Sequence, residues 1–401
     1  MNSGITVVGG IYRERCLHPT WNAVFGSAGR AAQNISPLVP GRKRLAGYVA
    51  DRIRDDVDLL ANLIDFEVMA TPAPAAVTFD YTHTLADPSI SPPLWRIARQ
   101  PPIPIEDENV LRYGMLEGDA IVRAKAAVYD PQSAFDGISF TANGSTADRL
   151  AVILNQLEMR NITGNDDPIK GAQWFFEQDN AEVVVLKMGA MGARVITRTG
   201  VHDIPLYKSN KVWKLGSGDV FSSTFAALWA VQGMGAEDAA ELASRSVAWY
   251  CENRSLPPPD PRTLRTLSME PLVPATGKIY LAGPFFDLGQ RWVVEEARRA
   301  LLQAGVEVFS PIHEIGPGKA EEVALADLKG LEGCQAVFAI LNGMDPGTIF
   351  EVGYAKKLGI PVVALAENER EEDLKMMAGS GMTITDDFVT AIYRTIWSLG
   401  R

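Results

Sequence analysis

The sequence predicts an α/β protein of two domains, each built on a largely parallel sheet. The chain has 401 residues, and a single core rarely grows beyond roughly 250–300 residues. In both halves, short apolar runs alternate with amphipathic helical segments, which is typical of parallel sheets covered by helices on both faces. Between the halves, residues 255–263 (SLPPPDPRT) hold four prolines and cannot continue a helix. We therefore expect domains at residues 1–265 and 276–401.

In the first half, the apolar patterns precede and follow a proline-rich stretch, residues 70–105, that we expect to be irregular. The run after residue 188, GAMGARVITRTG, predicts a hairpin. The pattern predicts strands at residues 5–9, 148–154 and 182–188, and helices at residues 219–232 and 236–253.

In the second half, helix ends are indicated by Gly305 and Gly359, and a strand end by Pro311. The pattern predicts strands at residues 278–283, 306–311, 336–341 and 361–366, and helices at residues 291–305, 321–333 and 348–359. This alternation predicts a doubly wound parallel sheet.

Charge and composition restrict the class of partner. The net charge of −11 argues against a broad nucleic-acid or anionic-membrane surface, because such partners need a basic face. No apolar stretch reaches the roughly 18 residues that a membrane span needs, and the first residues lack a signal-peptide core. The three cysteines form no CxxC pair and the four histidines are scattered, so neither a disulfide framework nor a zinc site is predicted. We expect a cytoplasmic protein that acts on small molecules.

Polar residues of the second half follow the strands at one edge of the predicted sheet. Tyr280 lies on its first strand, Asp345 follows the third strand, and Glu351 begins the next helix. Open parallel sheets bind ligands at the carboxyl ends of their strands. With Thr348 as the cap, Glu351 would lie in the first turn, where the helix dipole favours its ionised form.

An ionised carboxylate beside a second carboxyl group is what glycosidic-bond chemistry needs. One carboxylate attacks the anomeric carbon, and a protonated group helps the leaving group depart. Two neighbouring acids also push their pKa values apart, which separates these roles. Spacing alone leaves a second interpretation open, in which Asp345 and Glu351 are capping or solvated charges.

The segments IYLAGPFF (279–286) and DPGTIFEVGYA (345–355) resemble the nucleoside 2-deoxyribosyltransferase family. The resemblance covers essentially all of residues 278–401 and implies a flavodoxin/Rossmann-like doubly wound sheet without a cofactor. It implies that Glu351 is the nucleophile of a covalent deoxyribosyl-enzyme and that Tyr280 positions it. Asp327 and Asp345 would bind the nucleobase and shuttle its proton.

The same resemblance implies substrate contacts around these carboxyl groups. Gly283 would form the substrate-binding turn, Phe285 and Phe286 an apolar wall, and Met344 a stacking surface for the base. Members of the family often complete the site from a neighbouring subunit, so we expect a homo-oligomer. Where the family carries an Asn or Ser for this purpose, this chain has Lys375, which would contact the 5′ end of the sugar or a 5′-phosphate, or be solvated.

The first half carries a second chemical signal, the run Gly216-Ser217-Gly218-Asp219 at the start of a helix. Successive amides at a helix N-terminus bind anions, and an Asp directly after them can accept a proton from an attacking hydroxyl. A plain helix cap has the same pattern, so that interpretation stays open.

This run, together with Asn155-x-x-Glu158, VVVLKMGAMGARVI and the opening ITVVGGIYRE, resembles the ribokinase-like (PfkB-type) carbohydrate and nucleoside kinases. The resemblance implies a ribokinase-like α/β sandwich over residues 1–265. Asp219 would be the base, and the amides of Gly216, Ser217 and Gly218 the anion hole. Asn155 and Glu158 would organise magnesium and phosphate, with ATP and Mg²⁺ as cofactors if the domain is active.

Three departures from the kinase pattern lie on the sugar side. Glu14 stands where the family has Asp, the double-glycine turn is reduced to residues 28–32 (AGRAA), and residues 213–215 (WKL) replace Asp-Thr-Thr. Two hypotheses follow: a kinase with an altered substrate, such as a nucleoside, or a degenerate module that binds a ligand.

The two halves together predict an enzyme of nucleoside or nucleotide metabolism that cleaves or transfers the N-glycosidic bond of a (deoxy)nucleoside or its 5′-monophosphate, fused to a sugar or nucleoside kinase. The alternatives are a sugar kinase whose second domain only senses nucleotides, and a nucleotide-binding regulatory protein in which both domains lack turnover.

Overall fold

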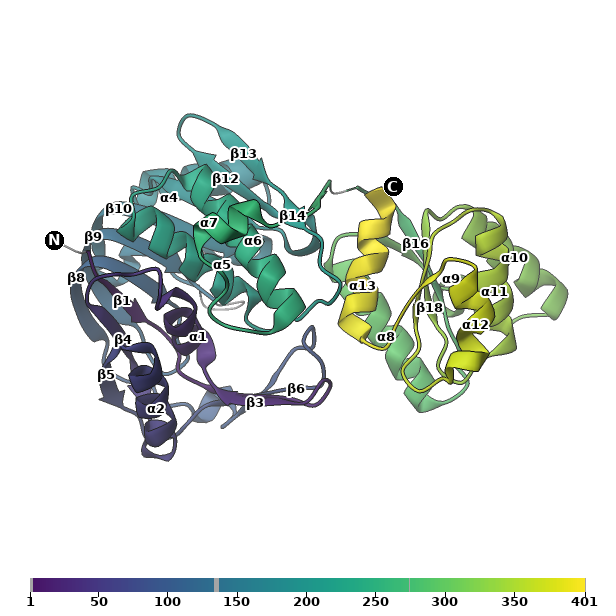
Figure 1. Ribbon diagram of the computed structural model, residues 1–401, viewed down its shortest axis with the longest axis horizontal. Helices are drawn as coiled ribbons and strands as arrows, with labels where there is room; N and C mark the ends of the chain where they lie inside the picture. Colours follow the sequence, from purple (N-terminus) through teal and green to yellow (C-terminus); the bar gives the residue numbers. More distant parts are fainter. Residues whose placement is uncertain (1–2, 133–136, 274, 401) are drawn as a thin grey trace. The chain divides into compact units, whose positions relative to one another are not determined.

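A computed structural model describes residues 3–132, 137–273 and 275–400. The chain forms two compact units: unit 1 comprises residues 1–209 and 213–271, and unit 2 comprises residues 210–212 and 272–401. Within the described residues, no helix is both long enough and apolar enough to cross a membrane. Each unit is an α/β structure with its own sheet (Figure 1), so the predicted fold class is confirmed.

Unit 1 is built on a sheet that has nine strands among the described residues, in the order β13-β12-β11-β10-β9-β8-β1-β4-β5. The strands from β5 to β11 pair in parallel, and the hairpin β11–β12–β13 adds two antiparallel strands at one edge. The strands are β1 (Ile5–Val8), β4 (Lys43–Val49), β5 (Glu67–Pro72), β8 (Ile103–Tyr113), β9 (Ala120–Asp130), β10 (Thr146–Asn155), β11 (Val183–Lys187), β12 (Ala193–Thr197) and β13 (Val201–Ile204).

Helices cover both faces of this sheet because alternate strand residues are apolar and buried. Val7 and Val185 face one core, whereas Val8 and Val184 face the other. The first core is closed by α1 (Gly26–Ile35), α2 (Arg54–Ile64), α5 (Ser217–Ala226), the π-helical turn Ala227–Val231, α6 (Ala236–Asn253) and α7 (Pro261–Thr266); the second is closed by α3 (Gln156–Thr163) and α4 (Pro168–Gln178).

A second sheet in unit 1 corrects the prediction that residues 70–105 are irregular. Its order is β3-β2-β6-β7, and β6 (Thr78–Tyr81) and β7 (Ser89–Ser91) lie inside that stretch, joined to β2 (Arg13–Cys16) and β3 (Trp21–Val24). The prolines lie outside these two strands. The strands are three or four residues long and β6 pairs with distant β2, so no local periodicity reveals them.

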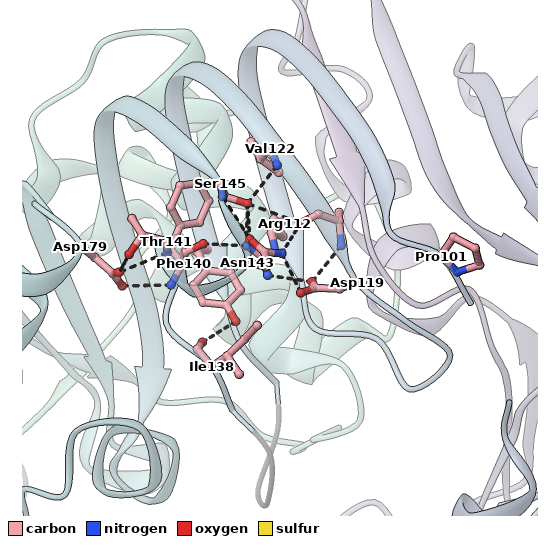
Figure 2. Close-up of polar contacts among 12 residues, drawn as sticks. Pro101, Arg112, Asp119, Val122, Ile138, Phe140, Thr141, Asn143, Ser145 and Asp179 are labelled. Carbon is pink, nitrogen blue, oxygen red and sulfur yellow. Dashed lines mark hydrogen bonds and ion pairs between the residues drawn. The ribbon is translucent and has the colours of Figure 1, made fainter. Parts of the chain in front are cut away.

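A buried arginine joins strands of unit 1 (Figure 2). The Arg112 guanidinium donates to Asp119 at 2.7 Å, and to the Phe140 carbonyl and Ser145 Oγ at 3.1 Å each. It also lies over the rings of Tyr129 and Phe140. Only 1% of the residue is exposed, so these contacts replace its hydration.

Unit 2 has a parallel sheet with the order β17-β16-β18-β19-β20 within the described residues. Numbered along the chain this is 2-1-3-4-5, the flavodoxin-like order, in which ligands bind between the first and third strands. Here those strands are β16 and β18. The strands are β16 (Lys278–Ala282), β17 (Glu307–Phe309), β18 (Ala336–Ile340), β19 (Val362–Leu365) and β20 (Thr383–Thr385).

The helices of unit 2 lie on both faces of its sheet (Figure 1). Val352 and Ala355 of one helix pack on Val337 and Ala339 of β18, and Phe388 packs edge-on against Phe338 from the other face. The helices are α8 (Leu288–Gln303), α9 (Pro311–Glu314), α10 (Ala320–Glu332), α11 (Pro346–Lys357), α12 (Glu371–Gly379) and α13 (Phe388–Trp397).

Two of these helices begin earlier than predicted because an aspartate caps each. Asp287 accepts from the Gln290 amide, so α8 begins at Leu288. Asp345 accepts from the Thr348 amide, with Pro at the first helical position, so α11 begins at Pro346.

The Arg112 contacts generate a stability prediction. We expect Arg112→Met to lower the free energy of unfolding by about 3–5 kcal/mol, because it leaves the Asp119 carboxylate without its buried cation. The control is Arg194→Met, which breaks a partly exposed pair with Asp203 and is expected to cost less than about 1 kcal/mol. Urea unfolding of both variants measures the difference, and equal losses would contradict the structural role of Arg112.

Candidate active sites

In unit 2 the phenol of Tyr280 and the carboxylate of Glu351 meet at the carboxyl edge of the sheet. Tyr280 is fully buried in β16, and its Oη donates to Glu351 Oε1 at 2.6 Å. The Tyr280 ring stacks on Phe309 of the neighbouring strand, with centroids 5.5 Å apart. Glu351 lies five residues after Pro346, hence in the second turn of α11 and not in the first. The contribution of the helix dipole is accordingly smaller than predicted, since it falls off within the first turn.

The environment of Glu351 favours its protonated form. Burial is the largest cause and raises the pKa to about 7, with smaller upward contributions from Asp327 and Asp345. The hydrogen bond from Tyr280 acts in the opposite direction and lowers that pKa. Burial and the Glu351 carboxylate in turn raise the pKa of Tyr280, so the phenol stays protonated and remains the donor.

The two predicted partner carboxyl groups differ in their bonding. Asp345 Oδ2 accepts from the Thr348 amide at 2.7 Å and from the Thr348 hydroxyl at 2.9 Å, so it caps α11. Asp345 is therefore the cap, and the prediction that Thr348 fills this role is wrong. Asp327 on α10 has a buried Oδ1 without a hydrogen-bond partner in the described part of the chain, and burial raises its pKa. Asp327 thus retains a polar atom for a ligand.

The predicted substrate-binding residues are placed unequally. Phe285 is half-buried and contacts Phe286, whose own surface is 72% exposed. Met344 has a positive φ of 50° and packs against the core beneath the site. A Cβ at Gly283 would meet Ile340 at 3.1 Å, so this turn needs a small residue. Lys375 is exposed and pairs with Glu372 at 3.1 Å.

Two acidic residues hold the loop between β18 and α11, and the sequence reasoning did not identify them. Asn342 donates to Glu367 at 2.7 Å and accepts from its amide, and the Gly343 amide donates to Glu369 at 2.7 Å. These bonds hold the loop that carries Met344 and Asp345. The available signal was the acidic run ENERE (367–371) directly after a buried strand.

In unit 1 the glycine-rich run forms the start of α5. Gly216 is the cap residue with a positive φ of 76°, and Ser217 and Gly218 are the first two helical residues. Two lysines lie beside this turn. Lys214 donates to Ser217 Oγ at 2.7 Å, and Lys187 at the end of β11 lies 3.8 Å from the position that a Cβ of Gly218 would take.

Asp219, the predicted base, has both carboxylate oxygens engaged within the protein. Arg30 Nη1 donates to Oδ2 at 2.7 Å, and Gln132 Nε2 donates to Oδ1 at 2.6 Å. Arg30 also forms a bidentate pair with Glu14. Sequence reasoning missed Gln132 and treated Arg30 only as a departure from the family. The sequence feature that could have identified Arg30 is a single cation within a helical segment of small residues.

The residues predicted to organise magnesium form a closed capping box at α3. Asn155 Oδ1 accepts from the Glu158 amide at 2.9 Å, and Glu158 Oε2 accepts from the Asn155 amide at 2.8 Å. Burial raises the pKa of Glu158 to about 7. The nearby Lys187 pairs with buried Asp130 at 2.6 Å. Among the described residues, no group of three or more His, Cys, Asp or Glu side chains could hold a metal ion.

Comparison with known proteins agrees with both resemblances. The family model of nucleoside 2-deoxyribosyltransferase matches residues 279–387, and that of the pfkB family carbohydrate kinases matches residues 147–261. The two predicted family resemblances are therefore confirmed, each by a family-model match to one segment of the chain. No curated protein matches the chain.

Solved structures similar to the chain include kinases with low sequence identity. Fructokinase from Vibrio cholerae, bound to fructose, ADP and calcium ion, is 15% identical over 63% of this chain and 94% of that chain, with a TM-score of 0.47. The nucleoside kinase of Methanocaldococcus jannaschii, an archaeal member of the ribokinase family, is 14% identical over 64% and 95%, with a TM-score of 0.48. A pyrophosphate-dependent kinase in the ribokinase family, complexed with a pyrophosphate analog and myo-inositol, is 14% identical over 66% and 100%, with a TM-score of 0.44.

The raised pKa of Glu351 generates a prediction for stability against pH. Because the folded pKa is about 7 and the ordinary value is near 4.5, this residue contributes stability at low pH that is lost as the pH rises through 7. We expect Glu351→Gln to raise Tm relative to wild type at pH 8, and the gain to fade toward pH 4.5. Calorimetry across this range measures it. Glu372→Gln, in the exposed pair with Lys375, is the control and should show no comparable pH dependence; a flat profile for Glu351→Gln would contradict the burial of this carboxyl group.

Proposed function

We propose that unit 2, whose residues 279–387 match the nucleoside 2-deoxyribosyltransferase model, cleaves or transfers the N-glycosidic bond of a (deoxy)nucleoside or its 5′-monophosphate. The observation that carries this proposal is the 2.6 Å hydrogen bond between Tyr280 and Glu351, placed where β16 and β18 diverge. A carboxylate with a single neutral donor keeps lone pairs for attack, and the carboxyl groups of Asp327 and Asp345 lie near enough to influence its charge.

In the proposed reaction, Glu351 in its ionised form attacks the anomeric carbon of the sugar. The bond from that carbon to the base nitrogen breaks, and its electron pair leaves with the base. Asp327 is the better proton donor to the departing base, because its pKa is raised while Asp345 caps α11. Water or a second base then takes the sugar from Glu351, which makes the enzyme a hydrolase or a transferase.

Phe285 and Met344 are the side chains that we assign to the base. Gly283 allows the turn after β16 to pack closely on Ile340. Phe286 is too exposed in a single chain to form a wall alone. With Leu288, which is 85% exposed, it supports the proposal of a homo-oligomer. Lys375 pairs with Glu372 in an exposed ion pair, which is weak enough to exchange for a 5′-phosphate, so that contact remains part of the proposal.

For unit 1 we propose that phosphate groups of a nucleotide such as ATP bind at the turn Gly216–Gly218, next to Lys187. The residues expected to hold Mg²⁺ do not fit that ion as they stand, because Asn155 and Glu158 bond to each other in a capping box. We therefore derive no phosphoryl-transfer step through magnesium.

Release of free base is the first test. Purified protein is incubated with nucleosides, 2′-deoxynucleosides and their 5′-monophosphates, with and without an acceptor base, and the free base is separated by chromatography. We expect wild type to release or exchange base, and the rate to fall at least roughly 1,000-fold in Glu351→Gln. Intact-mass spectra of wild type should show a covalent sugar adduct on Glu351. If Glu351→Gln releases base as fast as wild type, Glu351 is not the nucleophile and the proposed mechanism is wrong. If no substrate reacts, the nucleotide-sensing alternative replaces this proposal.

The Tyr280 hydrogen bond generates a prediction for the pH–rate profile. Tyr280→Phe removes a donor that stabilises the ionised form of Glu351, so the pKa of Glu351 rises further. We expect kcat/KM to fall about 10-fold or more and its acidic limb to move to higher pH. Tyr354→Phe on the same helix, which loses a hydrogen bond to Glu332, is the control. A lower rate without movement of the acidic limb would show that Tyr280 does not tune Glu351.

A further inference from the structure

Arg30 lies directly beside Asp219, the predicted base, and against Gly216 of the glycine-rich turn. Arg30 is on α1, Glu14 on β2 and Asp219 on α5. All three are buried, with exposed fractions of 1%, 6% and 6%. The guanidinium joins the two carboxylates, through both of its terminal nitrogens to Glu14 and through Nη1 to Asp219 at 2.7 Å.

A carboxylate acts as a general base only if one of its oxygens can reach the hydroxyl proton. Asp219 Oδ2 accepts from Arg30, and Oδ1 accepts from Gln132 at 2.6 Å. The Gln132 amide is itself fixed, because its Oε1 accepts from the Ser27 hydroxyl on α1. Both oxygens of the predicted base therefore face donors from the protein.

The space next to the anion-binding turn is filled as well. A Cβ built on Gly216 would lie 2.1 Å from Arg30 Nε and 2.3 Å from Arg30 Cζ, so the guanidinium lies directly against the backbone of the turn. In a kinase, the acceptor hydroxyl must approach the transferring phosphoryl group between this turn and the base. Here a side chain of the protein takes that volume.

One guanidinium faces two buried carboxyl groups in this cluster, and the Gln132 amide donates to the outer oxygen of Asp219. These donors replace part of the water that the carboxyl groups lose on burial, and burial still raises the pKa of Glu14. Removing Arg30 alone would leave Glu14 and Asp219 buried without their cation. The cluster therefore behaves as a structural ion network of the kind that Arg112 forms elsewhere in unit 1.

We propose that Arg30 is a built-in occupant of the acceptor site, which holds Asp219 as an ion-pair partner and prevents it from acting as the base of a kinase. Unit 1 then retains its anion-binding turn and does not transfer a phosphoryl group to an acceptor through Asp219. This inference concerns unit 1 alone and is independent of glycosidic activity in unit 2.

The experiment combines thermal unfolding and phosphoryl transfer in the full chain. Asp219→Asn removes one carboxylate of the network, and we expect it to lower Tm by roughly 5–10 °C. Asp203→Asn breaks the partly exposed pair with Arg194 and is the matched control, with an expected change of about 2 °C or less. Arg30→Met should lower Tm further, and the neutral triple variant E14Q/R30M/D219N should recover part of that loss, because no buried charge is left unpaired.

Transfer is measured with labelled ATP and with labelled inorganic pyrophosphate, against neutral sugars, nucleosides and sugar phosphates. We expect wild type and Asp219→Asn to transfer label to acceptors only at the background rate seen without protein. Phosphorylation of any acceptor, neutral or anionic, that disappears in Asp219→Asn overturns it. Stability measurements can overturn it too. Catalytic carboxylates do not usually support stability, so an Asp219→Asn protein as stable as wild type contradicts the proposal. A triple variant that is no more stable than Arg30→Met also contradicts it.

Discussion

Burial of carboxylates at the carboxyl edge of a parallel sheet is the constraint on which both sites depend. A carboxylate taken out of water needs a partner or accepts a raised pKa. Unit 2 gives Glu351 one neutral donor, Tyr280, and the pKa of Glu351 stays raised. Unit 1 gives Asp219 a guanidinium and an amide. The first arrangement leaves the carboxyl group with a raised pKa and one hydrogen-bond donor, and the second pairs the carboxylate with two donors.

The order of strands explains why the unit 2 site lies where it does. β16 and β18 are neighbours, yet the chain leaves them in opposite directions, which is the place where sheets of this strand order bind ligands. Tyr280 comes from β16, Asp345 caps α11 after β18, and Glu351 lies in the second turn of that helix. Glu367 and Glu369 after the next strand then fix the loop that carries Met344. The site is thus assembled from segments that are distant in sequence and meet because all the strands run in parallel.

Much of this could be predicted from the sequence, since strand and helix periodicity and the two motifs are local signals. Helix α6 occupies the predicted residues 236–253, and the family resemblances are carried by short contiguous runs. The small sheet β3-β2-β6-β7 was missed because it depends on pairing between β2 and β6, which are some 60 residues apart. The start of α11 was misplaced because Asp345 was assigned to chemistry when it also caps the helix. The partners of Asp219 were missed for the same kind of reason: Arg30 and Gln132 come from two separate segments, and no spacing relates them to Asp219.

The two units also show why a conserved-looking motif does not by itself define a reaction. The run Gly216–Asp219 takes the expected form, with a left-handed glycine before a helix and an aspartate at its third position. What decides its chemistry is the volume and charge opposite the aspartate, and there Arg30 stands against Gly216. In unit 2, Asp327 lies near enough to Glu351 to raise its pKa, and one buried oxygen of Asp327 has no protein partner among the described residues. Both oxygens of Asp219, by contrast, accept hydrogen bonds from protein side chains. Carboxyl groups at the two motifs therefore differ in their bonding, and that difference comes from distant segments and not from the motifs.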